Sequence, residues 1–428
     1  MSSASVKAEG AVQRHQQEPG IAAAIRRLDT PLTSYYLVTG ATVALLALGL
    51  VMVLSSSAVE SYAASGSAFS VFMRQAVFAL IGLPLMVLAT RVSLRTWTMT
   101  GYPLLIFAVL FQLLVFLPGL GKAVNGNRNW ISIAGFTMQP AEVGKFAVVV
   151  WAATVLARKR PLLDQPMHAL VPVVPGASVL LMLVLQGHDL GTALVLMALV
   201  GAVLFVAGAP LRIFLFGFAG AAVVVLGLVM SSQNRLNRID TWLSGGNCTA
   251  AQLLDSCLQT AHGQYALATG GWWGVGLGAS RQKWGLLPEA HNDFIFAVLG
   301  EELGLVGTLT VLALFAALAF GLMRIVLRSD DLFVKIATGG VLTWIIGQAV
   351  INIGAVLGVL PVVGVPLPLV SSGGSALVMA MVGLGMVIGF ARREPGAAEA
   401  LAARAGLVQR SLAVLPVRRD ARDSRGAR

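Results

Sequence analysis

Charged residues are scarce in this chain: only 11% of its 428 residues are Asp, Glu, Lys or Arg, whereas 57% are hydrophobic, which gives a mean hydropathy of +0.82. A soluble protein carries about 25% charged residues, so the composition excludes an ordinary soluble domain. Alternation of apolar and polar residues is also lacking, which excludes a membrane β-barrel. The sequence therefore predicts an all-α, polytopic integral membrane protein.

The chain does have continuous apolar runs, long enough to cross a hydrocarbon core of about 30 Å as helices. We expect about ten transmembrane helices, at residues 35–55, 71–90, 101–117, 139–157, 170–186, 190–208, 211–230, 293–323, 333–357 and 372–390. They form one membrane domain, 35–390, with a large outer loop at 231–292 between the seventh and eighth helices. A polar tail, 1–34, precedes this domain, and a basic tail, 391–428, which we expect to be disordered, follows it.

Residues 1–34 lack an apolar core, so we expect no cleavable signal peptide, and the first helix is expected to act as an uncleaved signal. With both termini in the cytoplasm, 22 of the 30 lysines and arginines lie inside, nine of them in 391–428. The positive-inside rule therefore predicts cytoplasmic termini and polar loops on the outer face. No nucleic-acid-binding fold accompanies the net charge of +11, so the basic tail indicates anionic lipid or an acidic partner and no nucleic acid.

Cysteine is nearly absent as well. Cys248 and Cys257 both lie in the large outer loop, where an oxidising exterior favours a disulfide between them. Two unpaired thiols are the alternative, and the surrounding sequence has no metal-binding spacing. The glycine cluster at 270–278, "GGWWGVGLG", has no βαβ context and predicts no dinucleotide site. Its Trp272 and Trp273 are typical of an interfacial belt or a re-entrant segment.

A few charged residues nevertheless lie in or beside the predicted helices. Pro140 suits the first helical position, which places Glu142 in the first turn and Lys145 one turn deeper. Either the two pair and line a polar cavity, or Glu142 complements the helix dipole while Lys145 snorkels to the interface. Asp189, at the junction of two helices, is either an N-cap for the second or a cavity residue.

The stretch "LLPEAHNDFIFAVLGEELG" places carboxylates at the mouth of the eighth helix and inside it. Asn292 is a good N-cap, so Asp293 is expected to open this helix near the outer headgroups, with His291 beside it. Glu301 and Glu302 lie deeper and point in different directions. Because intramembrane carboxylates are either functional or paired, we interpret these two as buried pairing residues with a structural role.

Prolines interrupt the segment "VLPVVGVPLPLVSSGGS", which precedes the tenth helix and contains Ser371, so it is not a continuous helix. Irregular backbone at membrane depth is tolerated beside protein or a water-filled cavity. Together with the charged residues, it predicts an outward-facing polar cavity. Such a cavity suits either an enzyme acting on a lipid-linked substrate or a transporter.

Four stretches resemble the SEDS family (shape, elongation, division, sporulation). They are 125–146, 188–193, 270–307 and 351–375. The third is long and specific, and its "SRQKW" and "LPEAH" are closer to the FtsW division branch than to the RodA elongation branch. Departures from the family pattern occur at Asn292, where Thr is usual, at Gly187-His188, where Glu-Pro is common, and at Ser372, where Tyr is usual.

The resemblance implies a peptidoglycan glycosyltransferase that polymerises lipid II by an inverting transfer at the outer face of the membrane. It implies Asp293 as the catalytic residue, which we interpret as the general base for the acceptor hydroxyl. The other candidate substrate-binding or cavity residues are Arg128, Glu142, Lys145, Asp189, His291 and Ser371. Lys145 and Arg128, with a divalent cation such as Mg²⁺ or Mn²⁺, would stabilise the departing diphosphate. No organic cofactor is expected.

The partners implied by the same resemblance are a class B penicillin-binding protein, which supplies transpeptidation, and other division proteins at the septum of the bacterial cytoplasmic membrane. The basic tail is a candidate contact for an acidic partner such as the tail of FtsZ. Two alternatives remain open: a flippase that moves lipid II between leaflets, and a non-catalytic septal scaffold. Polymer formation in detergent, where no second leaflet exists, separates the enzyme from the flippase, and a dispensable Asp293 would indicate the scaffold.

Overall fold

The computed structural model describes residues 30–124, 127–133, 135–244, 257–397, 399–401 and 403. Residues Ser34–Glu394 form one compact unit, called the bundle below. Most of the predicted tails 1–34 and 391–428 lies outside the described residues, so the expected disorder of the basic tail stays a prediction.

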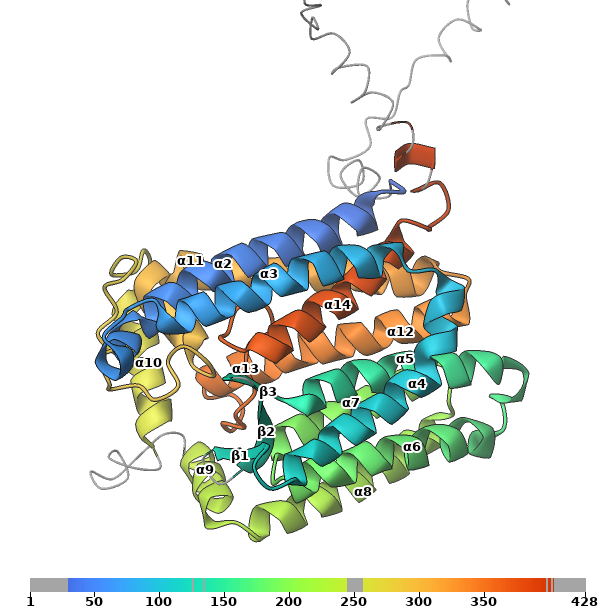
Figure 1. The fold of residues 1–428 in the computed structure, drawn as a ribbon, viewed down its shortest axis with the longest axis horizontal. Helices are drawn as coiled ribbons and strands as arrows, with labels where there is room; N and C mark the ends of the chain where they lie inside the picture. The colour runs from blue at the N-terminus through green and yellow to red at the C-terminus, as the bar shows by residue number, and fades with distance from the viewer. Residues whose placement is uncertain are drawn as a thin grey trace, which may run out of the picture. The chain divides into compact units, whose positions relative to one another are not determined.

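Long apolar helices make up the bundle (Figure 1). Those in its first half are α2 (Thr33–Ser65), α3 (Ser70–Arg91), α4 (Leu94–Leu113, extended by the 3-10 turn Leu114–Phe116), α5 (Pro140–Arg158) and α6 (Pro166–Gln186). Those in its second half are α7 (Leu190–Val206), α8 (Leu211–Met230), α11 (Ile295–Arg328), α12 (Leu332–Leu342), which continues through the π turn Thr343–Gly347 into α13 (Gln348–Val356), and α14 (Gly374–Ala391). Two shorter helices, α9 (Gln233–Leu243) and α10 (Leu258–Gly270), lie in the predicted large loop.

Each of the ten predicted runs corresponds to a helix of the bundle. Within the described residues, nine helices are long and apolar enough to cross a membrane, with α12 and α13 counted together. The sixth predicted run is α7, which is apolar but has only 17 residues. The all-α, multi-pass fold class is therefore confirmed, whereas helix ends differ: α2 continues to Ser65, ten residues beyond the prediction.

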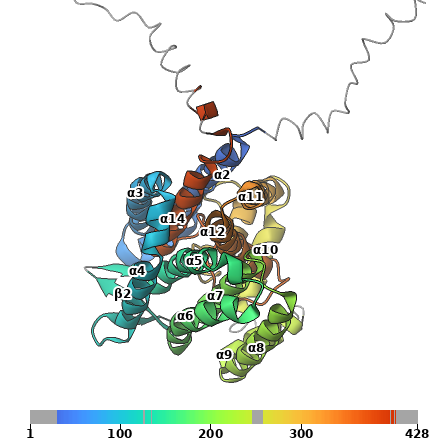
Figure 2. The same cartoon turned by 90° about the vertical axis from the view of Figure 1, so that its right-hand side faces the viewer.

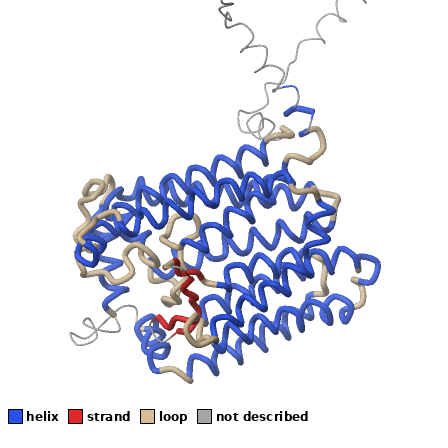
Figure 3. Tube along the Cα trace, in the orientation of Figure 1, coloured by secondary structure: helices blue, strands red, loops and turns tan. Residues whose placement is uncertain are grey.

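A small antiparallel sheet interrupts the helical pattern in the segment expected to be a polar loop. Its strands are β1 (Gly121–Val124), β2 (Asn127–Ile133) and β3 (Phe136–Met138), in the order β1-β2-β3. The sheet lies at the same end of the bundle as α9 and α10 (Figures 1 and 3), which we call the loop end. At the opposite end, α2 begins and α14 stops, and the Ser34 hydroxyl donates a hydrogen bond to the Glu394 carboxylate (3.2 Å).

Helix α5 forms the centre of the bundle. It is surrounded by α4, α6, α7, α12 and α14 (Figure 2). Of its 19 residues, 16 are buried. This burial explains why α5 tolerates a lysine and a glutamate only as partners, because an unpaired charge at this depth would cost several kcal/mol. Helix α8 is the opposite case, since Val229 is its single buried residue and many of its other side chains are exposed, as expected for a helix next to lipid.

Helix α11 is interrupted at Gly304, whose φ of +66° is left-handed and favours glycine. At the break, the carbonyl groups of Glu301 and Glu302 accept hydrogen bonds from the amides of Val275 and Gly276 (2.9 and 3.0 Å). The glycine cluster of residues 270–278 therefore forms backbone–backbone hydrogen bonds with the interrupted helix.

The side chains of Glu301 and Glu302 hold the following loop. The Glu301 carboxylate accepts hydrogen bonds from the Ser280 hydroxyl and from the Arg281 amide (3.0 Å). The Glu302 carboxylate pairs with the Lys283 ammonium (2.9 Å). Both acids are buried. The interpretation as a buried pairing residue is confirmed for Glu302, whereas Glu301 is held by hydrogen bonds from a hydroxyl and backbone amides.

Candidate functional site

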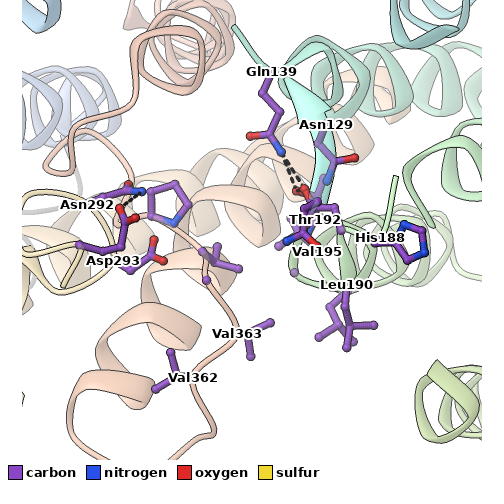
Figure 4. A pocket seen from close by; sticks show the side chains of 18 of the residues that line it. Asn129, Gln139, His188, Leu190, Thr192, Val195, Asn292, Asp293, Val362 and Val363 are labelled. Atoms are coloured by element: carbon purple, nitrogen blue, oxygen red, sulfur yellow. Dashed lines mark hydrogen bonds between the residues drawn. The ribbon is translucent and has the colours of Figure 1, made fainter. Parts of the chain in front are cut away.

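A cavity of about 890 Å³ lies at the loop end of the bundle. Its wall comes from the three strands, from α5, α7, α8, α9, α10, α13 and the start of α14, and from irregular segments that include residues 289–293, 361–366 and 372–373. Asn292 and Asp293 lie on one side of it, and Gln139, Asn129 and Thr192 lie across from them (Figure 4). A polar cavity beside the proline-rich segment is thus present, as the sequence predicted.

Asp293 lines this cavity without belonging to a helix. Helix α11 begins at Ile295, and Phe294 occupies its N-cap position without a side-chain bond. The predictions that Asn292 caps the helix and that Asp293 opens it are therefore wrong by two residues. As a consequence, the Asp293 carboxylate precedes the first turn and is removed from the position where the helix dipole stabilises negative charge most strongly.

The carboxyl group of Asp293 is only partly accessible, and its Oδ1 atom is buried without a hydrogen-bond partner among the described residues. Burial raises the pKa of this carboxyl to about 7; the nearby carboxylates of Glu289 and Asp189 also raise it, and the Arg238 guanidinium lowers it. Since an acid with a pKa near ambient pH is a suitable general base, this environment favours proton transfer to Asp293.

Three hydrogen bonds fix the backbone around Asp293. The Asn352 side-chain amide donates to the Asp293 carbonyl (2.8 Å), the Ser371 hydroxyl donates to the Asn292 carbonyl (2.6 Å), and the Ser372 amide donates to the His291 carbonyl (3.0 Å). Ser371 is buried and does not line the cavity. It instead supports the segment that carries Asp293.

Glu142 and Lys145 both line the cavity and form an ion pair, with 2.9 Å between Lys145 Nζ and Glu142 Oε1. Lys145 Nζ also donates to Gln348 Oε1 (3.1 Å) and lies 5.4 Å from the centre of the Trp344 ring. Both charged side chains are almost completely buried. Of the two alternatives left open by the sequence, the structure contains the cavity-lining pair; Lys145 does not snorkel.

Asp189 has both of the roles that the sequence left open. Its Oδ1 accepts a hydrogen bond from the Thr192 amide (2.9 Å), which makes it the N-cap of α7. Its Oδ2 accepts from Gln139 Nε2 (2.7 Å) and from the Thr192 hydroxyl (2.8 Å) at the cavity wall. The cap therefore also anchors part of the polar lining.

Arg128 and His291, like Ser371, do not line the cavity, although the sequence made them candidates for it. Arg128 directs a guanidinium nitrogen toward the Phe116 carbonyl (3.5 Å). His291 Nδ1 lies 3.1 Å from a carboxylate oxygen of Glu60 in α2. Neither side chain is brought to Asp293, so their predicted binding roles stay predictions without support from the cavity geometry.

Two cations of α9 that were not predicted from the sequence, Arg235 and Arg238, also line the cavity. The hydrogen bonds described for them go to carbonyl groups: Arg235 donates to His188 (2.9 Å), and Arg238 donates to Val362 (3.4 Å). Neutral carbonyls do not compensate a positive charge, so this wall favours an anion. A signal was present in "QNRLNRIDTWL", where two arginines spaced i, i+3 share one helix face.

Cys257 is buried next to α9 and α10. Cys248 lies outside the described residues, so the disulfide between them stays a prediction. Among the described residues, no group of three or more His, Cys, Asp or Glu side chains is arranged to hold a metal ion. The divalent cation expected from the sequence stays a prediction.

Residues 36–395 match the family of cell cycle proteins that contains FtsW, RodA and SpoVE. The chain is 41% identical over 376 residues to the probable peptidoglycan glycosyltransferase FtsW of Mycobacterium tuberculosis, which covers 88% of this chain and 71% of that protein. It is 36% identical over 352 residues to the stage V sporulation protein E of Bacillus subtilis, with 82% and 95% of the two chains covered.

Solved structures agree with the sequence relationships. The bundle superposes on a chain of a peptidoglycan synthase complex with a TM-score of 0.67 and 28% identity, over 83% of this chain and 97% of that one. The crystal structure of the rod shape determining protein RodA of Thermus thermophilus superposes with a TM-score of 0.61 and 27% identity, over 84% and 97%. The chain therefore belongs to the FtsW, RodA and SpoVE family of cell cycle proteins, and it is of the FtsW type.

Proposed function

We propose that this protein is a peptidoglycan glycosyltransferase that polymerises lipid II into glycan strands, with Asp293 as the general base. The observation that carries the proposal is the Asp293 carboxyl group, which lines a large polar cavity with a buried oxygen that has no partner among the described residues. The names of the FtsW relatives support the same activity.

In the proposed transfer, Asp293 removes the proton from the 4-hydroxyl of the acceptor sugar. The hydroxyl oxygen then attacks the anomeric carbon of the donor, a new C–O bond forms with inversion, and the bond to the undecaprenyl diphosphate breaks. The proton stays on Asp293 until solvent takes it, and the diphosphate leaves with both electrons of the broken bond. A base with a pKa of about 7 is partly ionised at neutral pH, so it can accept this proton and then release it.

The departing diphosphate requires positive charge. Lys145 lines the cavity but shares its charge with Glu142, whereas Arg235 and Arg238 contact only carbonyl oxygens in the bonds described. We therefore assign diphosphate binding mainly to the two arginines of α9, which would exchange carbonyl oxygens for phosphate oxygens. Arg128, predicted for this task from the sequence, lies outside the cavity lining. A divalent cation stays a proposal and has no part in these steps.

The isoprenoid chain requires an apolar path. Val225 and Val229 of α8 contribute to the cavity wall, and many other residues of α8 are exposed on the surface of the bundle. A lipid-linked sugar can therefore place its head group in the cavity while its tail stays in the surrounding lipid.

The orientation of the protein in the membrane, its cellular location and its partners are part of the same proposal. The distribution of lysine and arginine supports cytoplasmic termini, so that the cavity opens at the outer face of the bacterial cytoplasmic membrane, and the FtsW relationship supports work at the division septum. A class B penicillin-binding protein is the proposed partner for crosslinking, since the similar solved chain comes from a synthase complex that coordinates polymerization and crosslinking. The basic tail is the proposed contact for an acidic division protein such as FtsZ.

The test is polymer formation by purified protein in detergent, with lipid II and with or without the transpeptidase partner. Wild-type protein is expected to produce glycan strands, and Asp293→Ala is expected to produce none while remaining folded. Asp330→Asn, which changes an exposed carboxyl between α11 and α12, is the matched control and should polymerise normally. Strand synthesis by Asp293→Ala would contradict the role of Asp293, and transport of lipid II by a wild-type protein that forms no polymer would favour a flippase.

A further inference from the structure

Glu289 is a second carboxyl group in the cavity wall, four residues before Asp293, that the sequence analysis did not single out. Its φ of +56° lies in the left-handed region, which non-glycine residues seldom adopt and which strains the backbone. A glycine would remove this strain. The presence of glutamate at a position whose backbone favours glycine indicates that the side chain has a task there.

The backbone of Glu289 organises the turn that carries Asp293. Its carbonyl oxygen accepts hydrogen bonds from the amides of Asn292 (3.0 Å) and Phe294 (3.2 Å), the two neighbours of Asp293. The Glu289 carboxylate accepts a further bond from the Asn292 side-chain amide (3.4 Å). The left-handed conformation thus closes a turn that points both carboxyl groups into one cavity.

Other charges face the same cavity from several elements. The titratable or charged side chains that line it, apart from Asp293, are Lys122 of β1, Glu142 and Lys145 of α5, His188 and Asp189 before α7, Arg235 and Arg238 of α9, and Glu289. The charges of Glu142 and Lys145 compensate each other in an ion pair. His291, beside Asp293 in sequence, pairs with Glu60 and does not line the cavity.

Among these groups, Glu289 has the strongest effect on the carboxyl of Asp293. After burial, the Glu289 carboxylate is the largest cause that raises the pKa of Asp293, ahead of Asp189, and the Arg238 guanidinium opposes it. A negative neighbour favours the protonated form of a carboxyl, which is the form that Asp293 reaches once it has accepted a proton.

We propose that Glu289 is a positioning residue for Asp293: its carbonyl fixes the turn that directs Asp293 into the cavity, and its negative charge favours the transfer of the acceptor proton to Asp293. This inference rests on the proposed function, in which Asp293 is the base. Glu289 itself touches neither the donor carbon nor the acceptor hydroxyl in this scheme.

The first experiment is the pH dependence of polymerisation by wild type, Glu289→Gln and Glu289→Asp. Glu289→Gln keeps the size of the side chain and the backbone of the turn but removes the charge, so the acidic limb of the pH–rate profile should move to lower pH. The rate at high pH should fall several-fold, because Asp293 is then a weaker base. Glu289→Asp keeps the charge and should restore the limb toward the wild-type position. A purely structural role would lower the rate without moving the limb, and that result, or equal behaviour of the two variants, would overturn the proposal.

The second experiment does not depend on activity. The carboxyl vibration of Asp293 can be followed by infrared titration of the purified protein, with the band identified by its loss in Asp293→Asn. Its titration midpoint should lie at lower pH in Glu289→Gln than in wild type, and an unchanged midpoint would refute the proposal. If wild-type protein failed to polymerise lipid II but the midpoint still moved, the proposed function would fail while the coupling of the two carboxyl groups would stand.

Discussion

At the scale of single residues, Asp293 combines a buried oxygen, without a hydrogen-bond partner in the described part of the chain, with a backbone that three neighbours hold in place. Desolvation makes the ionised carboxylate less stable, so the group retains affinity for a proton at neutral pH. The rigid backbone matters equally, because a general base must lie within hydrogen-bond reach of the proton that it removes. The position of Asp293 thus depends on the hydrogen bonds of Asn352, Ser371 and Ser372, whereas its raised pKa depends on burial and on nearby charges.

The pH dependence of the reaction follows from the raised pKa of Asp293. The base must be ionised to act, so polymerisation should be low at acidic pH and rise as the pH increases through about 7. The initial rate measured from pH 5 to pH 9 checks this, with lipid II binding measured in parallel to separate binding from chemistry. An acidic limb near pH 4, the usual range for a carboxyl, would contradict the raised pKa.

The buried pair of Glu142 and Lys145 makes a second prediction. Lys145→Met would leave Glu142 buried without its cation, and loss of one partner of a buried pair costs about 3–5 kcal/mol. The apparent unfolding temperature in detergent should therefore fall markedly. The double variant Glu142→Gln with Lys145→Met should regain much of the stability, and equal stability of the single variant and wild type would contradict the pairing.

The sequence was informative for single residues whose chemistry is out of place in an apolar run. Asp293, Glu142, Lys145 and Asp189 were all predicted, and all line the cavity. Arg128 was also predicted, but it lies in β2 and directs its guanidinium toward the Phe116 carbonyl, a contact between segments that the local sequence does not indicate.

Two further arginines of the wall escaped prediction for a related reason. Arg235 and Arg238 lie on α9, and only tertiary contacts place this helix at the cavity, since Arg235 and Arg238 reach carbonyls of residues 188 and 362. The i, i+3 spacing of the two arginines indicates that they share one helix face. It does not indicate that this face lies at the cavity, because that depends on long-range contacts.

At the scale of elements, α11 shows how a helix can be broken without leaving polar groups unpaired. The carbonyls of Glu301 and Glu302 accept from the amides of residues 275 and 276, and the amides of residues 305 and 306 donate to the carbonyls of residues 271 and 272, so the glycine-rich segment provides partners on both sides of the break. This segment also carries Trp272 and Trp273, which are 70% and 81% exposed. Their predicted place in an interfacial belt stays a prediction.

The break in α11 can be tested with a pair of glycine variants. Gly304→Ala would place a Cβ 2.4 Å from the Gly274 amide nitrogen and force alanine into a left-handed conformation, which costs of order 1–3 kcal/mol. Gly40→Ala is the control, because a Cβ there has no atom within 4 Å and lies in the regular helix α2. Thermal unfolding in detergent should show a loss for the first variant and no loss for the second; equal behaviour would contradict the described break.

The sequence predicted which segments form the long helices, but it did not predict where those helices end. Apolar runs give the spans because lipid requires them, but the ends depend on contacts outside the run. The start of α11 at Ile295 follows from the turn closed by the Glu289 carbonyl, and the three short strands of residues 121–138 are too brief for a clear alternation. Both features require pairing between segments that the local pattern does not contain.

At the scale of the whole molecule, the bundle places its polar cavity at one end and the start of α2 and the end of α14 at the other. The positive-inside rule predicts that the terminal end lies in the cytoplasm. In the proposed function, the cavity then opens on the opposite face, where a lipid-linked sugar would be presented for wall synthesis.

The orientation can be tested by single-cysteine labelling after Cys248 and Cys257 have been replaced by serine. Trp284→Cys lies in an exposed loop at the loop end and should react with a membrane-impermeant maleimide in intact spheroplasts. Asp164→Cys lies in the exposed connection between α5 and α6 and should react only after the membrane is opened. The reverse pattern would contradict the assigned orientation and, with it, a reaction at the outer face.

The measurement that tests the central claim most directly is a structure of the protein with lipid II, or a non-transferable analogue, bound in the cavity. The account predicts that the acceptor 4-hydroxyl lies within hydrogen-bond reach of a carboxylate oxygen of Asp293, at roughly 2.6–3.2 Å, with the donor diphosphate against Arg235 and Arg238. An acceptor hydroxyl held away from Asp293, with another side chain in contact with it, would contradict the assignment of Asp293 as the base.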